Sequence, residues 1–179
     1  MDPTHDKTRD WLNAMSAHVL EHGLNTASLR PLAKAAGTSD RMLIYHFGNK
    51  DGVISALLSH IAAQFMAALS ASGTDRASST AALVSDVMTL QRQPEMVGFL
   101  GVWFDIISAA AHGNTAHHTT GQQIIDGFLE WIKTRLPEDD PAPDDTARAL
   151  LTLIEGMAVM DALGQTPVAD TALRRLLPD

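Results

Sequence analysis

Residues 23–53 read GLNTASLRPLAKAAGTSDRMLIYHFGNKDGV, and this stretch decides the fold. Ser28 stands directly before the apolar positions of one short helix, and Ser39 stands before those of a second. Gly37 lies between them and permits the tight turn that sets the second helix across the first. Asn49 then suits the N-cap of a longer helix. The spacing predicts a helix-turn-helix motif followed by a long helix.

Helical spacing continues on both sides of this stretch, whereas alternating strand patterns and hairpin turns are almost absent. Upstream, Trp11, Met15 and Val19 form one apolar stripe that stops at Gly23. Downstream, the pattern predicts helices over about 50–69, 80–92, 94–112, 119–136, 143–163 and 168–177. We therefore expect an all-α protein of about nine to ten helices, with an N-terminal three-helix domain over residues 1–50 joined by a long helix to a helical domain over 51–179.

Composition excludes several classes of protein. The 179 residues are 45% hydrophobic and 19% charged, which is typical of a globular chain and not of a disordered or collagen-like one. No cysteine is present, so disulfides, thiolate nucleophiles, zinc ribbons and iron–sulfur clusters are excluded. The polar start and the interruption of the apolar run 96–111 by Asp105 predict a cytoplasmic protein without a membrane span.

Charge is distributed unevenly along the chain. The net charge is -8, which by itself argues against a nucleic-acid partner. Residues 1–50, however, hold six Lys and Arg against five Asp and Glu, and the remainder holds seven against sixteen. The acidity therefore belongs to the C-terminal part, and the helix-turn-helix segment stays slightly basic.

The stretch 23–53 resembles the DNA-binding domain of the TetR family of bacterial transcription regulators. The residues that match the family pattern in register are Gly23, Thr26, Ser28, Arg30, Ala33, Ala36, Gly37, Ser39, Leu43, His46, Phe47, Lys50 and Asp51. The rest of the chain resembles the family in length, helix count and apolar pattern. The resemblance implies a ligand-binding and dimerisation domain behind the DNA-binding one.

The second short helix is the expected reader of DNA sequence. Its N-terminus suits a phosphate, and Arg41 suits a bidentate bond to guanine. The family resemblance adds contacts at the start of the first short helix and of the long helix. The expected DNA-binding residues are Ser28, Arg30, Ser39, Asp40, Arg41, Met42, Tyr45, His46 and Lys50. Asp40 and Arg41 depart from the family, which commonly has Lys and a small residue there, and Asp40 repels phosphate unless it meets a cytosine amino group or Arg41.

A homodimer is expected because one recognition helix reads one half-site. In the family two helices from each chain form a four-helix bundle across the two-fold axis, and the two penultimate helices here carry apolar stripes. The expected interface residues are Ile125, Phe128, Leu129, Ile132, Leu150, Ile154, Met157 and Ala158. The alternative is that part of each stripe faces the core of its own chain.

The middle helices are rich in large apolar residues, which is typical of a pocket wall or of an ordinary core. The resemblance implies a small-molecule effector in this domain. The expected effector-binding residues are Met88, Met96, Phe99, Trp103, Phe104, Asp105, Ile107 and Trp131. Asp105 lies on a face with small residues, where it meets another helix, solvent or a ligand donor.

His112, His117 and His118 form one further polar cluster. Their spacing does not match a zinc-binding helix motif, so we expect solvated loop histidines and no metal site. An enzyme that used Asp105 and these histidines as acid and base is the alternative from another class. No phosphate-binding loop or GxSxG motif accompanies them, so we expect no enzyme and no cofactor.

These features together predict a sequence-specific DNA-binding transcriptional regulator, expected to be a repressor that a small, largely apolar effector releases from its operator. The expected partners are palindromic double-stranded operator DNA, a small-molecule effector and a second copy of the chain, without a membrane. The alternative function is a DNA-binding dimer whose C-terminal domain only dimerises or binds a protein partner.

Overall fold

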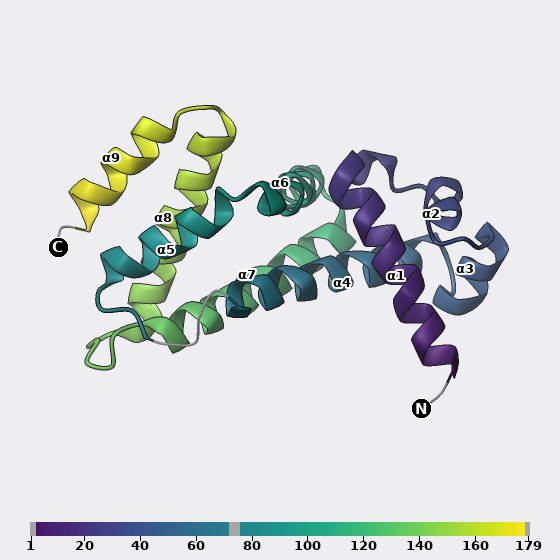
Figure 1. Ribbon diagram of the computed structural model, residues 1–179, viewed down its shortest axis with the longest axis horizontal. Helices are drawn as coiled ribbons and strands as arrows, with labels where there is room; N and C mark the ends of the chain where they lie inside the picture. Colours follow the sequence, from purple (N-terminus) through teal and green to yellow (C-terminus); the bar gives the residue numbers. More distant parts are fainter. Residues whose placement is uncertain (1–2, 72–75, 178–179) are drawn as a thin grey trace. The chain divides into compact units, whose positions relative to one another are not determined.

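The computed structural model describes residues 3–71 and 76–177, and within these ranges the regular elements are helices (Figure 1). They are α1 Pro3–His22, η1 Leu24–Thr26, α2 Leu29–Ala35, α3 Asp40–Phe47, α4 Lys50–Ala71, α5 Thr80–Gln91, η2 Pro94–Met96, α6 Val97–Ala111, α7 Thr115–Arg135, α8 Pro143–Ala162 and α9 Thr166–Leu176. The expected all-α fold is confirmed. The main differences are that α7 begins four residues before the expected Thr119, that α9 begins two residues before the expected Val168, and that the helix expected from Pro94 opens with the 3-10 turn η2.

Local chemistry explains the helix-turn-helix boundaries. Gly37 has φ +61°, a left-handed conformation that side chains other than glycine rarely adopt, and it ends α2. The Ser39 side chain then accepts the backbone N–H of Met42 at 3.3 Å and caps α3. At the start of α4, Asn49 Oδ1 accepts the backbone N–H of Gly52 at 2.8 Å. Each of these three turns was expected from the sequence.

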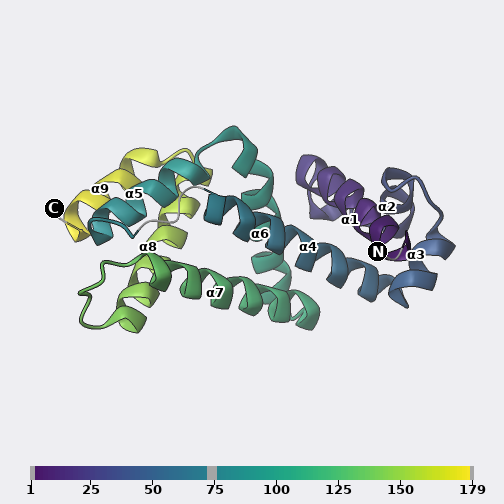
Figure 2. The same cartoon turned by 60° about the horizontal axis from the view of Figure 1, so that its bottom comes forward.

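The chain divides into two compact units, which we describe separately. The first comprises residues up to 65 and 98–124, and the second comprises 66–97 and from 125 onward. In the first unit α1 lies beside α2, which contacts α3 (Figures 1 and 2). Its buried apolar core is formed by Trp11, Met15, Val19, Leu32, Ala33, Leu43, Val53, Leu57, Leu58, Ile61, Val102 and Ile106. This core includes two residues of α6, so α6 packs with the helix-turn-helix. The expected functional division after residue 50 stays a prediction.

The second unit is built on the packing of α5, α8 and α9 (Figure 2). Its buried apolar residues include Val84, Val87 and Met88 of α5, and Arg92 follows that helix. The Arg92 guanidinium bonds Asp161 of α8 at 2.8 Å and Asp170 of α9 at 2.8 Å, so one cation at the end of α5 links that helix to α8 and α9. Hydrophobic burial and the ion pairs of Arg92 therefore help to hold this unit together.

Most of the residues expected at the dimer interface are buried within the single chain. Six of these eight residues are at most 3% exposed within a single chain, so their side chains belong to the chain's own core: Phe128, Ile132, Leu150, Ile154, Met157 and Ala158. Only the half-buried Ile125 and Leu129 retain accessible surface. A stripe with helical spacing looks the same whether it faces a core or a partner, and an interface role for these six residues stays a prediction.

Two helical segments are long and apolar enough to cross a membrane, judged by length and composition. They are Lys50–Ala71 and Pro94–Ala111, so the interruption by Asp105 does not exclude the second segment on this criterion, contrary to the expectation. Both segments also place side chains in the first unit's core, including Leu57 from one and Ile106 from the other. Core helices of soluble proteins satisfy the same length and composition criteria.

Candidate functional site

The recognition helix α3 packs against the first unit with one face and exposes the other face to solvent. Leu43 is fully buried, and burial of a leucine contributes about 2 kcal/mol to the stability of such a helix against its neighbours. On the open side Tyr45 is 79% exposed and Met42 is 38% exposed, although both are large and apolar. Asp40 and Arg41 are exposed as well. The first unit therefore presents polar and apolar side chains on one helix face, as groove readout requires.

The start of α2 supplies a second set of exposed groups. Ser28 takes the N-cap position with extended backbone, but its side chain makes no capping hydrogen bond. Arg30 is exposed, and Lys34 follows one turn later on the same side of α2. Lys34 was missing from the expected contacts. Its i, i+4 spacing from Arg30 is the sequence signal that would have found it.

The ring of His46 is held by two other aromatic rings. It meets Trp11 of α1 edge-on at 4.9 Å and Tyr45 at 5.4 Å between centroids. The Nζ of Lys7 lies 5.6 Å from the centre of the Trp11 ring. His46 is half-buried, so only the exposed part of its ring is able to contact a phosphate. Lys7 is a further cation at this position that the sequence interpretation did not assign.

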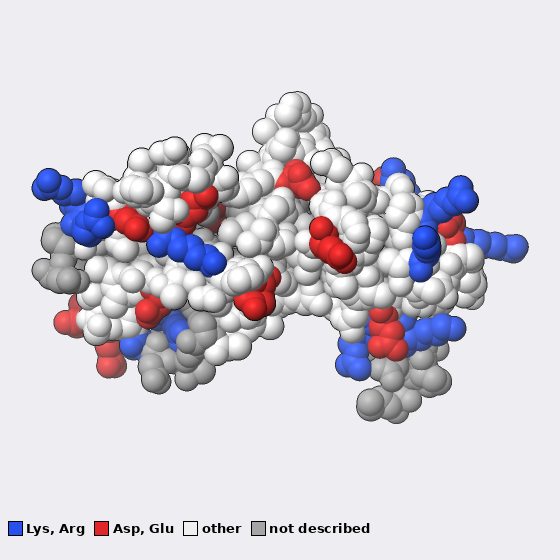
Figure 3. Space-filling model, turned by 45° about the horizontal axis from the view of Figure 1, so that its top comes forward, with Lys and Arg blue, Asp and Glu red and all other residues white. Residues whose placement is uncertain are grey.

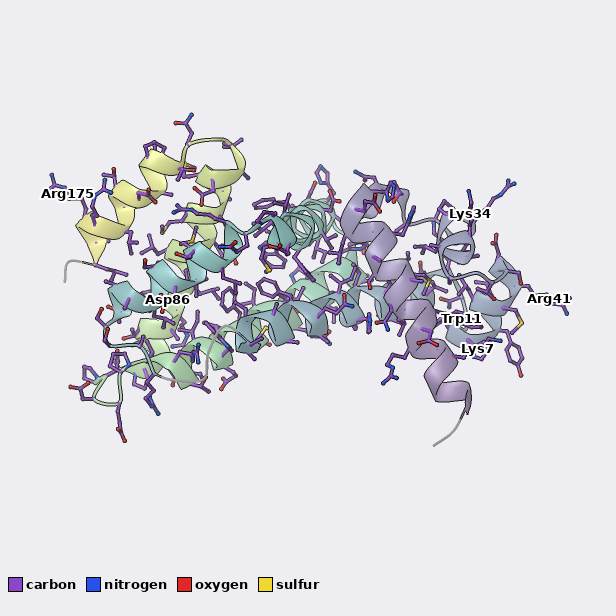
Figure 4. All side chains as sticks on the ribbon, viewed as in Figure 1. Lys7, Trp11, Lys34, Arg41, Asp86 and Arg175 are labelled. Carbon is purple, nitrogen blue, oxygen red and sulfur yellow. The ribbon has the colours of Figure 1, made fainter. Side chains whose placement is uncertain are left out.

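The cations near the recognition helix have no ion-pair partner among the residues that the structure describes: Arg30, Lys34, Arg41 and Lys50. Asp40 does not pair with Arg41, so that expected alternative is not realised in these described helices. Figure 4 shows Lys34 and Arg41 projecting away from their helices, and Figure 3 shows Lys and Arg side chains standing out from this unit at the right. Unpaired cations are free to replace the counterions of DNA phosphates.

Asp105 connects α6 to the DNA-binding motif. Its Oδ2 accepts the backbone N–H of Leu24, the first residue of η1, at 3.0 Å. Nearby, a Cβ on Gly98 of α6 would lie 2.5 Å from the carbonyl oxygen of Leu20 in α1, so only glycine allows this approach. The sequence left three partners open for Asp105: another helix, solvent or a ligand. In the structure its partner is the backbone of another helical element, η1. The Asp105 side chain is therefore committed to η1.

The expected effector-binding residues are distributed over both units. Phe99, Trp103, Phe104, Asp105 and Ile107 belong to the first unit, and Met88, Met96 and Trp131 belong to the second. Phe99 and Trp103 pack against the first unit's core, while Met88 and Met96 are at most 2% exposed in the second. Trp131 is half-buried and lines a groove of about 560 Å³ in the second unit. Apolar spacing alone did not separate core side chains from cavity walls.

The histidine cluster forms no metal site in the described part of the chain, where no group of three or more suitable ligands converges. The Nδ1 of His112 lies 2.7 Å from the carbonyl oxygen of Ser108, and the backbone N–H of His117 donates to the Asn114 side chain at the start of α7. These hydrogen bonds are typical of the end of α6 and the start of α7.

Comparison with known proteins gives the motif a family. Residues 17–57 match the family described as bacterial regulatory proteins, tetR family. The transcriptional regulatory protein RaaS of Mycobacterium tuberculosis is 28% identical over 139 residues, which cover 75% of this chain and 60% of RaaS. This chain therefore spans less than two thirds of that relative. The transcriptional regulator BetI of Burkholderia thailandensis is 25% identical, over 94% of this chain and 88% of BetI.

Solved structures share the fold. A TetR-family transcriptional regulator from Rhodococcus sp. aligns with a TM-score of 0.73 at 20% identity, over 94% of this chain and 95% of the other. The multidrug binding protein EbrR, solved in complex with imidazole, aligns with a TM-score of 0.69 at 21% identity, over 99% and 92%.

The matched segment 17–57 contains η1, α2, α3 and the start of α4, which are the elements that carry the exposed cations and the recognition face. The family that matches this segment is described as one of bacterial regulatory proteins. Residues 17–57 are therefore similar to the tetR family of bacterial regulatory proteins, and the chain as a whole is similar to transcriptional regulators in sequence and shares their fold.

Proposed function

We propose that this regulator represses transcription by binding a palindromic operator as a homodimer, and that a small-molecule effector releases it. The observation that carries the proposal is the open face of α3, where Arg41, Met42 and Tyr45 are exposed over the buried Leu43. The unpaired cations beside this face supply the phosphate contacts, and Arg41 supplies base readout. The regulator acts in the cytoplasm, where its operator is accessible.

A second copy is placed against α8 and α9. Exposed large apolar side chains remain there after the core has formed: Val159 at 39%, Leu163 at 68%, Val168 at 50% and Leu176 at 65%. Apolar surface of this kind is typical of an interface, and a symmetric dimer explains two half-sites. This surface replaces the buried stripe of Phe128 and Ile154 as the interface.

Effector release is supported by the joint between Asp105 and Leu24. A ligand that prefers one arrangement of the effector-binding domain shifts the equilibrium between two orientations of the DNA-binding helices by its differential affinity. A hydrogen bond from the η1 backbone to α6 is a direct mechanical connection for that shift. EbrR, which shares the fold, is described as a multidrug binding protein, and this is consistent with a small-molecule effector here.

The test is selection of bound fragments from random duplex DNA at physiological salt, with the mass of the protein measured in the same sample. The expected result is a palindrome whose half-sites are one helical turn apart, bound by a dimer. A single asymmetric site, or no enrichment from a well-folded dimer, would contradict the proposal.

The interface is tested separately by Leu163→Glu, with Val97→Glu as the matched control because Val97 is similarly exposed, at 64%, and lies at the start of α6, outside α8 and α9. Leu163→Glu is expected to yield a monomer at micromolar concentration, whereas Val97→Glu stays dimeric. Equal masses for the two variants would remove α8 and α9 from the interface.

A further inference from the structure

A charged groove in the second unit has not been assigned a role so far. It has a volume of about 560 Å³ and lies between α5, α7 and the segment before α5. Its walls are formed by Arg76, Ala77, Ser78, Ala82, Leu83, Asp86, Val87, Thr89, Leu90, Gln93, Trp131 and Arg135. All of these residues belong to the second unit. Its volume falls within the range of small-molecule sites.

Two guanidinium groups line this groove. One Nη of Arg76 donates to the carbonyl oxygen of Leu136 at 2.8 Å, and the backbone N–H of Ala77 donates to the carbonyl oxygen of Arg135 at 2.9 Å. These two bonds fasten the segment before α5 to the C-terminal end of α7 and so bring both arginines to the same groove. A guanidinium has five N–H donors, so Arg76 keeps several after its bond to Leu136.

The arginines adjoin an apolar and aromatic wall. The guanidinium carbon of Arg135 lies 5.1 Å from the centre of the Trp131 ring, and Trp131 in turn meets Phe128 at 5.8 Å. Leu83, Val87 and Leu90 of α5 complete the apolar part. Stacking on Trp131 fixes the Arg135 guanidinium in place, which lowers the entropic cost of binding an anion with it.

We propose that this groove binds an organic monoanion with a planar aromatic body. Its carboxylate pairs with the guanidiniums of Arg76 and Arg135, and its ring lies on the apolar wall around Trp131 and Leu90. This inference rests on the proposed function, because it names the chemical class of the effector. It replaces the largely apolar effector expected from the sequence with an amphipathic anion.

Asp86 limits the charge of the ligand. It is an exposed carboxylate on α5 (Figure 4), lines the same groove and has no ion-pair partner among the described residues. Two guanidiniums and one carboxylate leave the groove with a net charge of about +1, which suits a monoanion better than a dianion or a neutral ligand. Replacement of Asp86 by asparagine is therefore expected to strengthen binding of a monoanion.

The experiment is isothermal titration of the purified full-length protein, without DNA, using matched probes. The anions are benzoate and 2-naphthoate, and the neutral partners of the same shape are benzamide and 2-naphthamide. The expected result is that each carboxylate binds at least tenfold more tightly than its amide. Arg76→Gln and Arg135→Gln are each expected to weaken 2-naphthoate binding by about ten- to a hundredfold, because a charge-assisted hydrogen bond is lost.

Three variants control for indirect effects. Arg175→Gln removes the same charge from α9, outside the groove (Figure 4), and is expected to leave binding unchanged. Arg135→Lys keeps the positive charge and is expected to restore part of the affinity. Asp86→Asn is expected to raise the affinity for 2-naphthoate. Circular dichroism of each variant shows whether the fold is retained, and Asp86→Asn and Arg175→Gln carry the test if an arginine variant does not fold.

Equal binding of carboxylates and amides, no binding by either, or equal losses in Arg175→Gln and Arg135→Gln would overturn the inference. Because the titration contains no DNA, failure to bind 2-naphthoate leaves the operator selection unaffected. Conversely, a protein that binds 2-naphthoate but selects no palindrome keeps the groove and loses the proposed repressor function.

Discussion

The cations around the recognition helix are unpaired in the ranges that the structure describes, whereas several cations of the second unit have carboxylate partners. Around the recognition helix, Arg30, Lys34, Arg41 and Lys50 have no ion-pair partner within the described chain. In the second unit, by contrast, Arg92 bonds Asp161 and Asp170, Lys133 bonds Glu130 and Asp144, and Arg148 bonds Asp145. Cations that are already neutralised stabilise the protein's own helices, whereas unpaired ones stay available for an external anion. Whether a basic residue is available to bind DNA therefore depends more on whether a carboxylate already pairs with it than on where it lies in the chain.

Arg41→Ala gives the largest expected change at a single base pair. Loss of the guanidinium is expected to reduce discrimination at one operator position by about 1–3 kcal/mol, because a bidentate contact to guanine is lost. Sequencing of selected DNA measures this for the wild type and for the variant. Identical sequence profiles would show that Arg41 does not read a base.

Removing two unpaired cations is expected to weaken all DNA about equally. The double variant Lys34→Gln, Lys50→Gln should lose about tenfold in affinity for operator and random duplex alike, and its salt slope should decrease by about two. Titration of labelled duplex at several salt concentrations measures both quantities. Arg148→Gln, which removes a paired cation of the second unit, is the control and should leave the slope unchanged.

Arg92→Ala tests whether a paired cation of the second unit contributes to stability and not to DNA binding. It leaves Asp161 without its guanidinium partner at the junction of α5, α8 and α9, so the free energy of unfolding is expected to fall by about 1 kcal/mol. Urea unfolding at neutral pH measures this loss. Operator affinity at a temperature well below unfolding should stay at the wild-type value, and a tenfold loss there would break the division between the two kinds of cation.

The smallest expected effect is a pH dependence of that same cluster. Partial burial of Asp161 favours its neutral form, but hydrogen bonds from Arg92 and Thr166 and the charge of Arg92 together hold its pKa below the ordinary value of 3.8. The ionised carboxylate therefore stabilises the folded state above about pH 4, and this contribution is lost as the pH falls through the lowered pKa. The difference in unfolding free energy between wild type and Arg92→Ala should shrink from pH 7 toward pH 2.5. A constant difference would assign the effect of Arg92 to packing.

The sequence predicted the helices and the recognition motif because local chemistry determines them. Caps at Ser39 and Asn49 and the turn at Gly37 act over a few residues, so they can be recognised from the sequence without knowledge of the tertiary structure. The dimer and effector residues depend on which helices meet. Ile154 is fully buried in its own chain and Trp131 lines a groove with Arg76, a residue from a distant segment, and neither relation follows from helical periodicity.

Lys34 and Arg135 are residues that the sequence prediction missed although a local sequence signal for each exists. Both have an i, i+4 neighbour of interest on their own helix, Arg30 and Trp131 respectively, so a local search of charges would have identified each as a candidate. Asp105 had no such signal. Its partner lies 81 residues away in the chain, and only the packing of α6 against η1 reveals it.

The bond between Asp105 and Leu24 has a consequence for how such regulators acquire new operators. The group that Asp105 holds is a backbone N–H, which every residue except proline provides. The recognition residues on α3 can therefore be exchanged, and position 24 itself can vary, while the connection to α6 is retained. A helix-turn-helix with different recognition residues, grafted between Leu24 and Phe47, would therefore keep its hydrogen bond to α6.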